Sequence, residues 1–158
     1  MIDTSKKFLV AGAGKSGIGS VNLLLKTGAD VSLYDGNEEL DKEALFEKLY
    51  EKKEISLVLG NITKEDIEKY DLLVLSPGIS VNAPIAQMFY DQEKPVWSEI
   101  ELAYQASKGK IAAITGTNGK TTTTALTGEI MKGYYESSFV VGNIGIPYTS
   151  VAADTTEE

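Results

Sequence analysis

The apolar positions in the first hundred residues form short runs separated by longer amphipathic stretches. The apolar runs lie at Phe8–Ala11, Val31–Tyr34, Ile55–Leu59 and Leu72–Leu75. Runs this short and this uniformly apolar predict strands that are buried on both faces, as in parallel sheets. Spacing typical of helices occupies the stretches between and after them, at 18–26, 38–52, 64–69 and 83–92, before a short strand at 95–97. The pattern predicts an α/β fold with a Rossmann-like, doubly wound parallel sheet in a domain of residues 1–97.

A second strand, loop and helix pattern follows a helical stretch at 98–107. Lys110–Ile114 predicts a strand, Thr115–Gly119 a glycine-bearing turn, 120–132 a helix, and Phe139–Val141 a further strand. Two strands and one helix cannot close a sheet that is covered by helices on both faces. Residues 98–158 are therefore interpreted as the beginning of a second nucleotide-binding α/β domain, truncated within that domain.

A glycine-rich turn connects the first predicted strand to the first predicted helix. Residues Gly12–Gly17 have the sequence GAGKSG, and Asp35 ends the next predicted strand. Glycines let the backbone approach a phosphate, the helix N-terminus can receive an anion, and an acidic residue at that strand end can accept hydrogen bonds from ribose hydroxyls or a base. We expect a nucleotide site, with NAD and UDP-sugars both open. The alternative is that the glycines only permit tight packing of the strand against the helix.

The loop Ser76–Ile79, with the sequence SPGI, follows the fourth apolar run. It would lie at the carboxyl edge of the sheet, where open α/β sheets bind their ligands. Taken alone, Ser-Pro-Gly is typical of an ordinary turn, because proline sets the bend and glycine tolerates positive φ. Its position beside the first glycine loop favours a binding role.

The stretch Thr115–Thr122, TGTNGKTT, predicts a phosphate-binding loop. Its amides can surround phosphates, Lys120 can reach the β- and γ-phosphate oxygens, and the hydroxyl of Thr121 can bind Mg²⁺. The spacing departs from GxxxxGK[ST], because Ile114 stands where that pattern has its first glycine. We expect ATP and Mg²⁺ as cofactors, making the second domain a P-loop-type α/β ATP-binding domain, with ATP bound by Gly116, Thr117, Asn118, Gly119, Lys120, Thr121 and Thr122.

Composition excludes several classes of function. The net charge is −8, with 15 lysines and no arginine, which gives no basic stripe for nucleic acid or an anionic membrane. Without cysteine or histidine the chain cannot form disulfides, thiolate metal sites or a Ser-His-Asp triad. The start lacks the pattern of a signal peptide, and no apolar stretch approaches the roughly 18 residues of a membrane span. We expect a cytoplasmic protein.

Several motifs together resemble one family. TGTNGKTT resembles the ATP-binding signature of the Mur ligase and folylpolyglutamate synthase superfamily. Together with GAGKSG, SPGI, WSEIELA at 97–103 and GNIG at 142–145, it is similar to the Mur ligase family, closest to its D-glutamate-adding branch. The resemblance implies an ATP-dependent, amide-forming ligase of peptidoglycan precursor synthesis. In that reaction the carboxylate of UDP-N-acetylmuramoyl-L-alanine receives the γ-phosphoryl group of ATP, and the amine of D-glutamate attacks the resulting acyl phosphate.

The resemblance also implies roles for individual residues. Lys120 would be catalytic, and the UDP-linked substrate would be bound by Gly14, Lys15, Ser16, Asp35, Ser76, Pro77, Gly78 and Asn143. Asn37 stands where the family often has an arginine near the nucleotide, so contacts there are expected to differ. The remaining catalytic groups of the family would lie beyond Glu158, and we expect the chain to be inactive alone. The alternatives are an NAD-dependent oxidoreductase and a non-catalytic nucleotide-binding protein.

Overall fold

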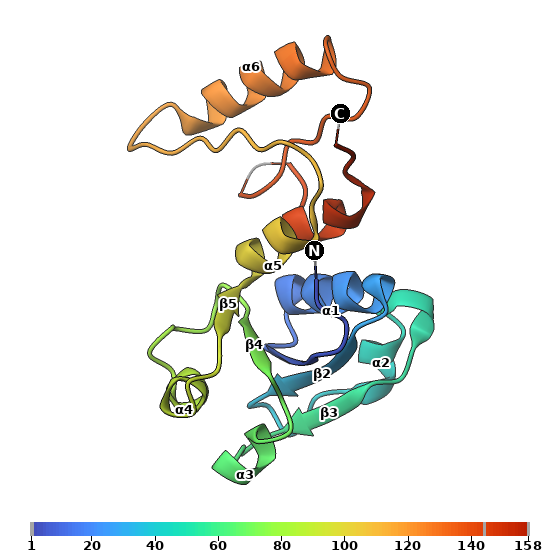
Figure 1. The fold of residues 1–158 in the computed structure, drawn as a ribbon, viewed down its shortest axis with the longest axis vertical. Coiled ribbons are helices and arrows are strands. Elements are labelled where there is room, and N and C mark those ends of the chain that lie inside the picture. Colours follow the sequence, from blue (N-terminus) through green and yellow to red (C-terminus); the bar gives the residue numbers. More distant parts are fainter. Residues whose placement is uncertain (1, 144, 158) are drawn as a thin grey trace.

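A five-stranded parallel sheet forms the centre of the computed structural model, which describes residues 2–143 and 145–157 (Figure 1). The strand order is β3-β2-β1-β4-β5. The strands are β1 (Lys7–Ala11), β2 (Asp30–Asp35), β3 (Ser56–Leu59), β4 (Leu72–Leu75) and β5 (Val96–Ser98). Phe8 on β1 pairs with Val31 on β2 and with Leu72 on β4. The strand order therefore reverses at β1, and open α/β sheets bind ligands outside the carboxyl ends of the strands at such a reversal.

Helices cover both faces of the sheet. They are α1 (Lys15–Thr27), α2 (Lys42–Phe46), α3 (Lys64–Ile67), α4 (Pro84–Asp91) and α5 (Glu99–Ala106). Phe8 and Val10 pack in one apolar cluster with residues of α1 and α5, whereas Leu9 and Ala11 pack in a second cluster with residues of α3 and α4. Because successive strand residues point to opposite faces, a strand covered on both faces must be apolar throughout. The predicted doubly wound α/β fold is confirmed here.

The prediction of one helix over residues 38–52 is mostly wrong. Only α2 and a short 3-10 helix, η1 (Tyr50–Lys52), form within it. The Asn22 side chain on α1 donates to the Lys48 carbonyl (3.1 Å) and accepts from the Tyr50 amide (2.7 Å). These tertiary bonds involve the backbone groups of two residues that a continuous helix would pair internally. Glu51 and Lys52 also adopt positive φ values of 54° and 52°, which a helix does not allow.

The predictions of strands at 110–114 and 139–141 are both wrong. Residues 110–114 form no strand among the described residues, and the predicted strand Phe139–Val141 is reduced to a single bridge between Val141 and Ile146. A strand is defined by its hydrogen-bonded neighbours. In the described part of the chain no strand pairs with 110–114, and 139–141 has only the bridge to Ile146. The predicted helix at 120–132 is confirmed as α6 (Lys120–Lys132).

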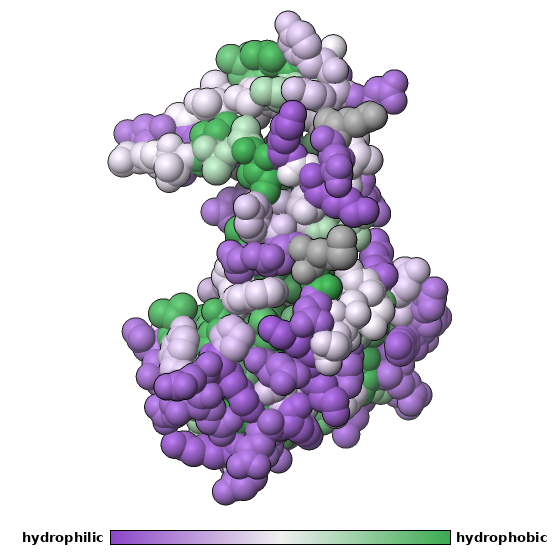
Figure 2. Space-filling view, viewed as in Figure 1, coloured by the Kyte–Doolittle hydropathy of each residue, from purple (hydrophilic) through white to green (hydrophobic). Residues whose placement is uncertain are grey.

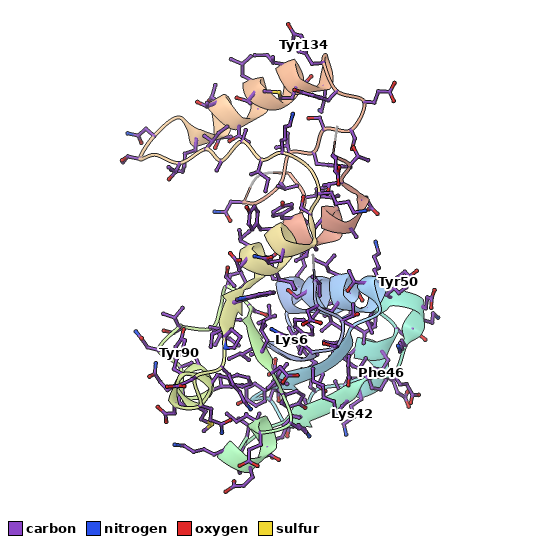
Figure 3. All side chains as sticks on the ribbon, viewed as in Figure 1. Lys6, Lys42, Phe46, Tyr50, Tyr90 and Tyr134 are labelled. Atoms are coloured by element: carbon purple, nitrogen blue, oxygen red, sulfur yellow. The ribbon has the colours of Figure 1, made fainter. Side chains whose placement is uncertain are left out.

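Helix α6 lies apart from the sheet (Figure 1). Its apolar side chains Leu126 and Ile130 are 62% and 50% exposed, and Tyr134, just beyond its end, is 83% exposed (Figure 3). Figure 2 shows apolar residues on the surface of this part of the molecule. The helices around the sheet bury their apolar side chains, whereas Leu126 and Ile130 of α6 are not covered by other described residues.

The end of the described chain returns to the sheet domain. Two 3-10 helices, η2 (Tyr148–Ser150) and η3 (Ala152–Asp154), pack on α1 and α5. Tyr148, Val151 and Ala152 are buried in the same apolar cluster as the inner faces of α1 and α5. Segments far apart in the sequence therefore share one core. Across residues 2–143 and 145–157, no helix combines the length and apolarity that crossing a membrane would require.

Candidate functional site

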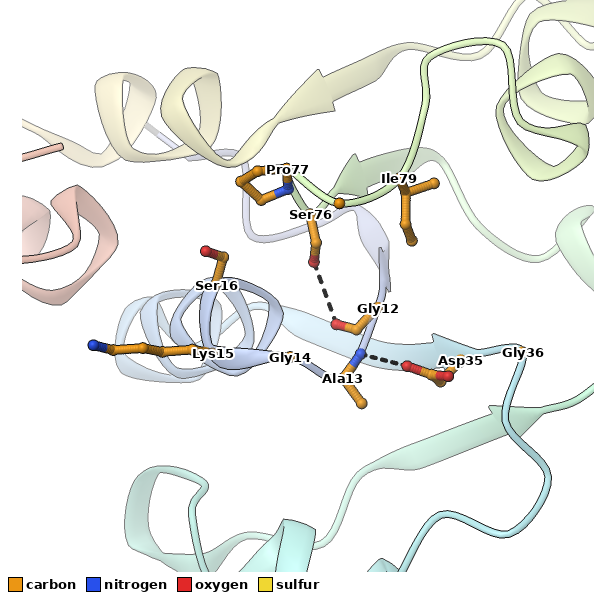
Figure 4. Close-up of a pocket in the computed structure, with 11 residues that line it drawn as sticks. Gly12, Ala13, Gly14, Lys15, Ser16, Asp35, Gly36, Ser76, Pro77 and Ile79 are labelled. Atoms are coloured by element: carbon orange, nitrogen blue, oxygen red, sulfur yellow. Dashed lines mark hydrogen bonds between the residues drawn. The ribbon is translucent and has the colours of Figure 1, made fainter. Parts of the chain in front are cut away.

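A pocket of about 510 Å³ opens at the carboxyl edge of the sheet, beside the strand reversal at β1 (Figure 4). Four segments surround it: the loop after β1, the start of α1, the end of β2 and the loop after β4. Its lining residues are Gly12, Ala13, Gly14, Lys15, Ser16, Asp35, Gly36, Ser76, Pro77, Gly78 and Ile79. The volume lies within the roughly 300–1,000 Å³ that small-molecule and cofactor sites occupy.

Asp35 orients the loop after β1. Its Oδ2 accepts a hydrogen bond from the Ala13 amide at 2.7 Å, and its Oδ1 accepts one from the Asn37 amide at 2.9 Å. A carboxylate has about four acceptor positions, so each oxygen retains capacity for a further donor. Asp35 can therefore fix the glycine loop and still accept a hydrogen bond from a ligand hydroxyl.

Ser76 ties the loop after β4 to the loop after β1. Its buried hydroxyl donates to the Gly12 carbonyl at 3.3 Å, and its amide donates to the Ala11 carbonyl at 3.1 Å. Gly12 has φ of +96°, and a Cβ there would lie 3.0 Å from the Ser76 hydroxyl oxygen. Gly12 is thus required by both its conformation and its close neighbour.

The other two glycines of the loop have opposite surroundings. A Cβ at Gly17 would lie 1.7 Å from the Gly12 carbonyl oxygen, so this position allows the close approach of α1 to the loop. A Cβ at Gly14 would meet nothing within 4 Å among the described residues, and the Gly14 backbone is ordinary extended chain at φ −69° and ψ −179°. Packing therefore explains Gly12 and Gly17 and leaves Gly14 unexplained, at a position that lines the pocket.

The first turn of α1 borders the pocket. Gly14 is its N-cap, and no side chain of the described residues caps it. The first amides of a helix lack partners within the helix and, with the helix dipole, favour an anion at that end. Lys15 adds a positive charge, and its exposed side chain extends away from Asp35 (Figure 4). This end of the pocket suits a phosphate group.

The loop predicted to bind ATP lies in the other part of the molecule, at the start of α6. Gly116 and Gly119 have positive φ values of 149° and 76°, which favour glycine. The Lys120 ammonium donates to the carbonyl oxygens of Gly116 and Thr117. Thr117, Asn118, Thr121 and Thr122 are exposed, and none of residues 115–122 lines the pocket beside β1. The two predicted sites are separate.

The pocket brings together most of the residues predicted to bind the UDP-linked substrate. These are Gly14, Lys15, Ser16, Asp35, Ser76, Pro77 and Gly78. Asn143 is exposed and does not line the pocket. The sequence-based set missed Gly12, Ala13, Gly36 and Ile79. Gly12, Ala13 and Ile79 could have been found, because all three belong to the motifs that indicated the site. Within the described ranges, no group of three or more acidic side chains is arranged to hold a metal ion.

Comparison with known proteins matches residues 6–98 to the family described as Mur ligase MurD-like, N-terminal domain. The UDP-N-acetylmuramoylalanine–D-glutamate ligase of Lachnospira eligens is 53% identical over 154 residues, covering 98% of this chain and 34% of the relative. The enzyme of the same name from Lachnoclostridium phytofermentans is 51% identical over 153 residues, covering 97% and 34%. The chain thus spans about a third of the length of the curated relatives it matches.

Solved structures show the same fold. A pseudomurein peptide ligase type C from Methanothermus fervidus aligns with a TM-score of 0.52 and 26% identity, covering 80% of this chain and 26% of that one. A murein peptide ligase from Psychrobacter arcticus aligns with a TM-score of 0.52 and 19% identity, covering 80% and 26%, and supports the fold alone. The family match covers more than half of the chain and includes the whole sheet and its pocket. The chain therefore belongs to the Mur ligase family and has a MurD-like N-terminal domain.

Proposed function

We propose that the pocket beside β1 binds the uridine diphosphate of UDP-N-acetylmuramoyl-L-alanine, and that this chain is the N-terminal part of a ligase that joins D-glutamate to that substrate at the expense of ATP. The observation that carries the proposal is Gly14, whose open surroundings leave room for a ligand at the uncapped start of α1. The names of the relatives at 51% and 53% identity support the choice of ligand.

Different groups around the pocket would bind different parts of the ligand. The first amides of α1 and the Lys15 ammonium supply positive potential for the diphosphate. The Asp35 carboxylate supplies an acceptor for a ribose hydroxyl or a base N–H, because each of its oxygens has a free lone-pair position. The Ser76–Gly78 loop closes the opposite side of the pocket. Asn143 would contact the part of the substrate that extends out of the pocket.

The second proposed site is the loop at residues 115–122, which we assign to ATP and Mg²⁺. When a triphosphate binds, the Lys120 ammonium would exchange the Gly116 and Thr117 carbonyls for phosphate oxygens and stabilise the charge on the transferring phosphoryl group. The Thr121 hydroxyl would contribute one ligand to Mg²⁺, with phosphate oxygens as others. The acyl phosphate formed on the substrate carboxylate would then react with the amine of D-glutamate, releasing phosphate.

The proposal includes the organisation and location of the protein. We place the boundary between the UDP-binding domain and the start of the ATP-binding domain at Trp97, and the protein in the cytoplasm. The net charge of −8 supports the absence of nucleic acid or an anionic membrane among its partners. The chain spans about a third of the length of the relatives named as ligases, so we expect no ligation by the chain alone.

The test is isothermal titration of the chain with UDP-N-acetylmuramoyl-L-alanine and, separately, with NADH. Saturable binding of the UDP-sugar without binding of NADH is expected. Binding of NADH alone would contradict the proposal and make the glycine loop a redox-cofactor site. If neither ligand binds, the assignment of the uridine site to this chain is contradicted.

Two lysine variants provide a matched comparison. Lys15→Ala removes a positive charge that lines the pocket and is expected to weaken UDP-sugar binding several-fold. Lys120→Ala removes the same charge from the other loop and is expected to leave UDP-sugar binding unchanged, because Lys120 does not line the pocket. An equal loss in both variants would contradict the assignment of two separate sites.

A further inference from the structure

A buried carboxylate in the WSEIELA stretch has a partner far away in the sequence. Glu99 begins α5 and is 7% exposed, the one acidic side chain that is buried among the described residues. The hydroxyl of Thr149 on η2, itself 3% exposed, donates to Glu99 Oε1 at 3.2 Å, across 50 positions of sequence. Burial of a carboxylate is costly without a donor, so this hydrogen bond fixes η2 against α5.

Thr149 also contacts α1, close to the pocket. A Cβ at Gly19 would lie 2.7 Å from Thr149 Oγ1, so η2 approaches the α1 backbone directly at a position without a side chain. Gly19 follows Lys15 by about one helical turn and lies on the same face of α1. The Glu99–Thr149 pair therefore joins α5, η2 and α1 within a turn of the residues that line the pocket.

A second set of contacts fixes the other end of this segment. The Thr155 hydroxyl oxygen accepts from the Lys108 amide at 2.9 Å and lies 3.0 Å from the Ser107 hydroxyl, just beyond α5. Tyr148, Val151 and Ala152 are buried between these two points. Residues 147–155, which we call the clasp, are therefore held at both ends and along the apolar side.

The clasp continues directly from the loop that contains Asn143. The Gly142 amide donates to the Ile146 carbonyl at 3.1 Å, and the Ile146 amide donates to the Val140 carbonyl at 3.3 Å, which closes the loop at its base. Pro147, with its restricted φ, connects that base to η2. The position of Gly142 and Asn143 relative to α1 therefore depends on how the clasp is held, and the Glu99–Thr149 hydrogen bond is its contact nearest to the loop that joins two side chains.

We propose that Glu99 and Thr149 are positioning residues, whose hydrogen bond helps to hold Gly142 and Asn143 where the Asn143 side chain can contact the sugar and peptide part of the ligand. This inference rests on the proposed function, because it requires the uridine diphosphate to occupy the pocket beside β1. It predicts that losing the bond weakens binding of the extended ligand and spares binding of the nucleotide alone.

The test compares two probes, UDP and UDP-N-acetylmuramoyl-L-alanine, by isothermal titration of the 158-residue chain. Thr149→Val keeps the shape of the side chain and removes the hydroxyl donor. It is expected to lower the affinity for the extended ligand about tenfold, the order expected for a hydrogen bond to a charged group, and to leave the UDP affinity unchanged. Thr149→Ser keeps the hydroxyl and is expected to retain both affinities.

Gly19→Ala provides a second route that leaves Glu99 and Thr149 in place. Its methyl group would displace the Thr149 hydroxyl, and the same selective loss is expected. Equal weakening of both probes, no weakening of either, or failure of Thr149→Ser to retain binding would overturn the inference. Wild-type chain that binds both probes equally overturns only this inference, whereas wild-type chain that binds neither refutes the proposed function and this inference with it.

Discussion

Gly14 and Gly17 differ in why glycine occupies the position. Gly17 is required for packing, whereas the surroundings of Gly14 are open and leave room for a ligand. Gly17→Ala is expected to destabilise the fold by about 2–3 kcal/mol, in the range of overpacked interiors, because the added Cβ would lie 1.7 Å from a backbone carbonyl that cannot rotate away. Urea unfolding monitored by circular dichroism measures this change. A stability equal to wild type would contradict the close packing of α1 on the loop.

Gly14→Ala is the matched control for that change. The added Cβ meets no neighbour within 4 Å and φ is −69°, so stability is expected to stay within about 1 kcal/mol of wild type. The affinity for UDP is expected to fall, because the methyl group occupies space that the ligand needs. Unchanged UDP affinity would show that Gly14 does not border the bound nucleotide.

The sequence could predict much of the pocket at the scale of residues, because GAGKSG and SPGI each follow a strand that the apolar runs indicate. It could not predict that Asp35 accepts backbone hydrogen bonds from Ala13 and Asn37, since the first of these depends on β1 and β2 lying side by side. The sequence could not predict the Glu99–Thr149 hydrogen bond either, because no local pattern indicates a contact between residues 50 positions apart.

At the scale of elements, the short helix α3 (Lys64–Ile67) starts with a capping box. Asp66 Oδ2 accepts from both the Thr63 amide and the Thr63 hydroxyl at 2.9 Å, and the Asp66 amide donates to the Thr63 hydroxyl oxygen at 3.3 Å. The hydrogen bond from the Thr63 backbone, followed by that from its side chain, lowers the pKa of Asp66 below its ordinary value of 3.8. Both bonds favour the ionised carboxylate.

The expected pH dependence follows from that direction. A lowered folded-state pKa means that the cap stabilises α3 at pH values above the ordinary pKa and that this stabilisation is lost as pH falls through the folded-state pKa. Carbon-detected NMR titration of the Asp66 carboxyl measures the midpoint, which is expected below 3.8. Thr63→Ala should move it back toward the ordinary value. A midpoint at or above 3.8 in the wild-type chain would contradict the capping geometry.

Elements that carry their own determinants were predicted well, and elements that need a partner were not. The runs Phe8–Ala11 in β1 and Leu72–Leu75 in β4 are apolar and buried on both faces, and the start of α6 follows glycines with the positive φ values that favour glycine. The segment at 110–114 has the composition of a strand but no neighbouring strand among the described residues. The helix predicted at 38–52 does not continue past Phe46. One reason is that the Asn22 side chain on α1 forms hydrogen bonds with the Lys48 carbonyl and the Tyr50 amide.

At the scale of the whole molecule, the chain leaves the sheet domain after α5 and returns to it at η2. The intervening part contains α6 and its exposed apolar side chains, whereas the clasp packs on α1 and α5 and buries Tyr148, Val151 and Ala152 there. Stability is therefore expected to be uneven along the sequence, with residues 109–140 opening more readily than the segments on either side.

Limited digestion with trypsin tests this arrangement. The first cleavages are expected at Lys108, Lys110, Lys120 and Lys132, which are exposed and border or lie within the part outside the sheet. The released piece that contains residues 147–155 is expected to stay bound to the sheet domain, because Tyr148 and Ala152 remain in its core. Size-exclusion chromatography followed by mass spectrometry measures both. Immediate separation of the two pieces would contradict the packing of the clasp.

The central claim is that the pocket beside β1 is a uridine nucleotide site. The most direct measurement is a titration of the ¹⁵N-labelled chain with UDP, followed by amide NMR. The account predicts saturable shifts at the amides of Ala13, Gly14, Lys15, Ser16 and Gly78, with the amides of residues 116–122 unmoved. Shifts confined to 116–122, or no shifts at the loops after β1 and β4, would contradict it.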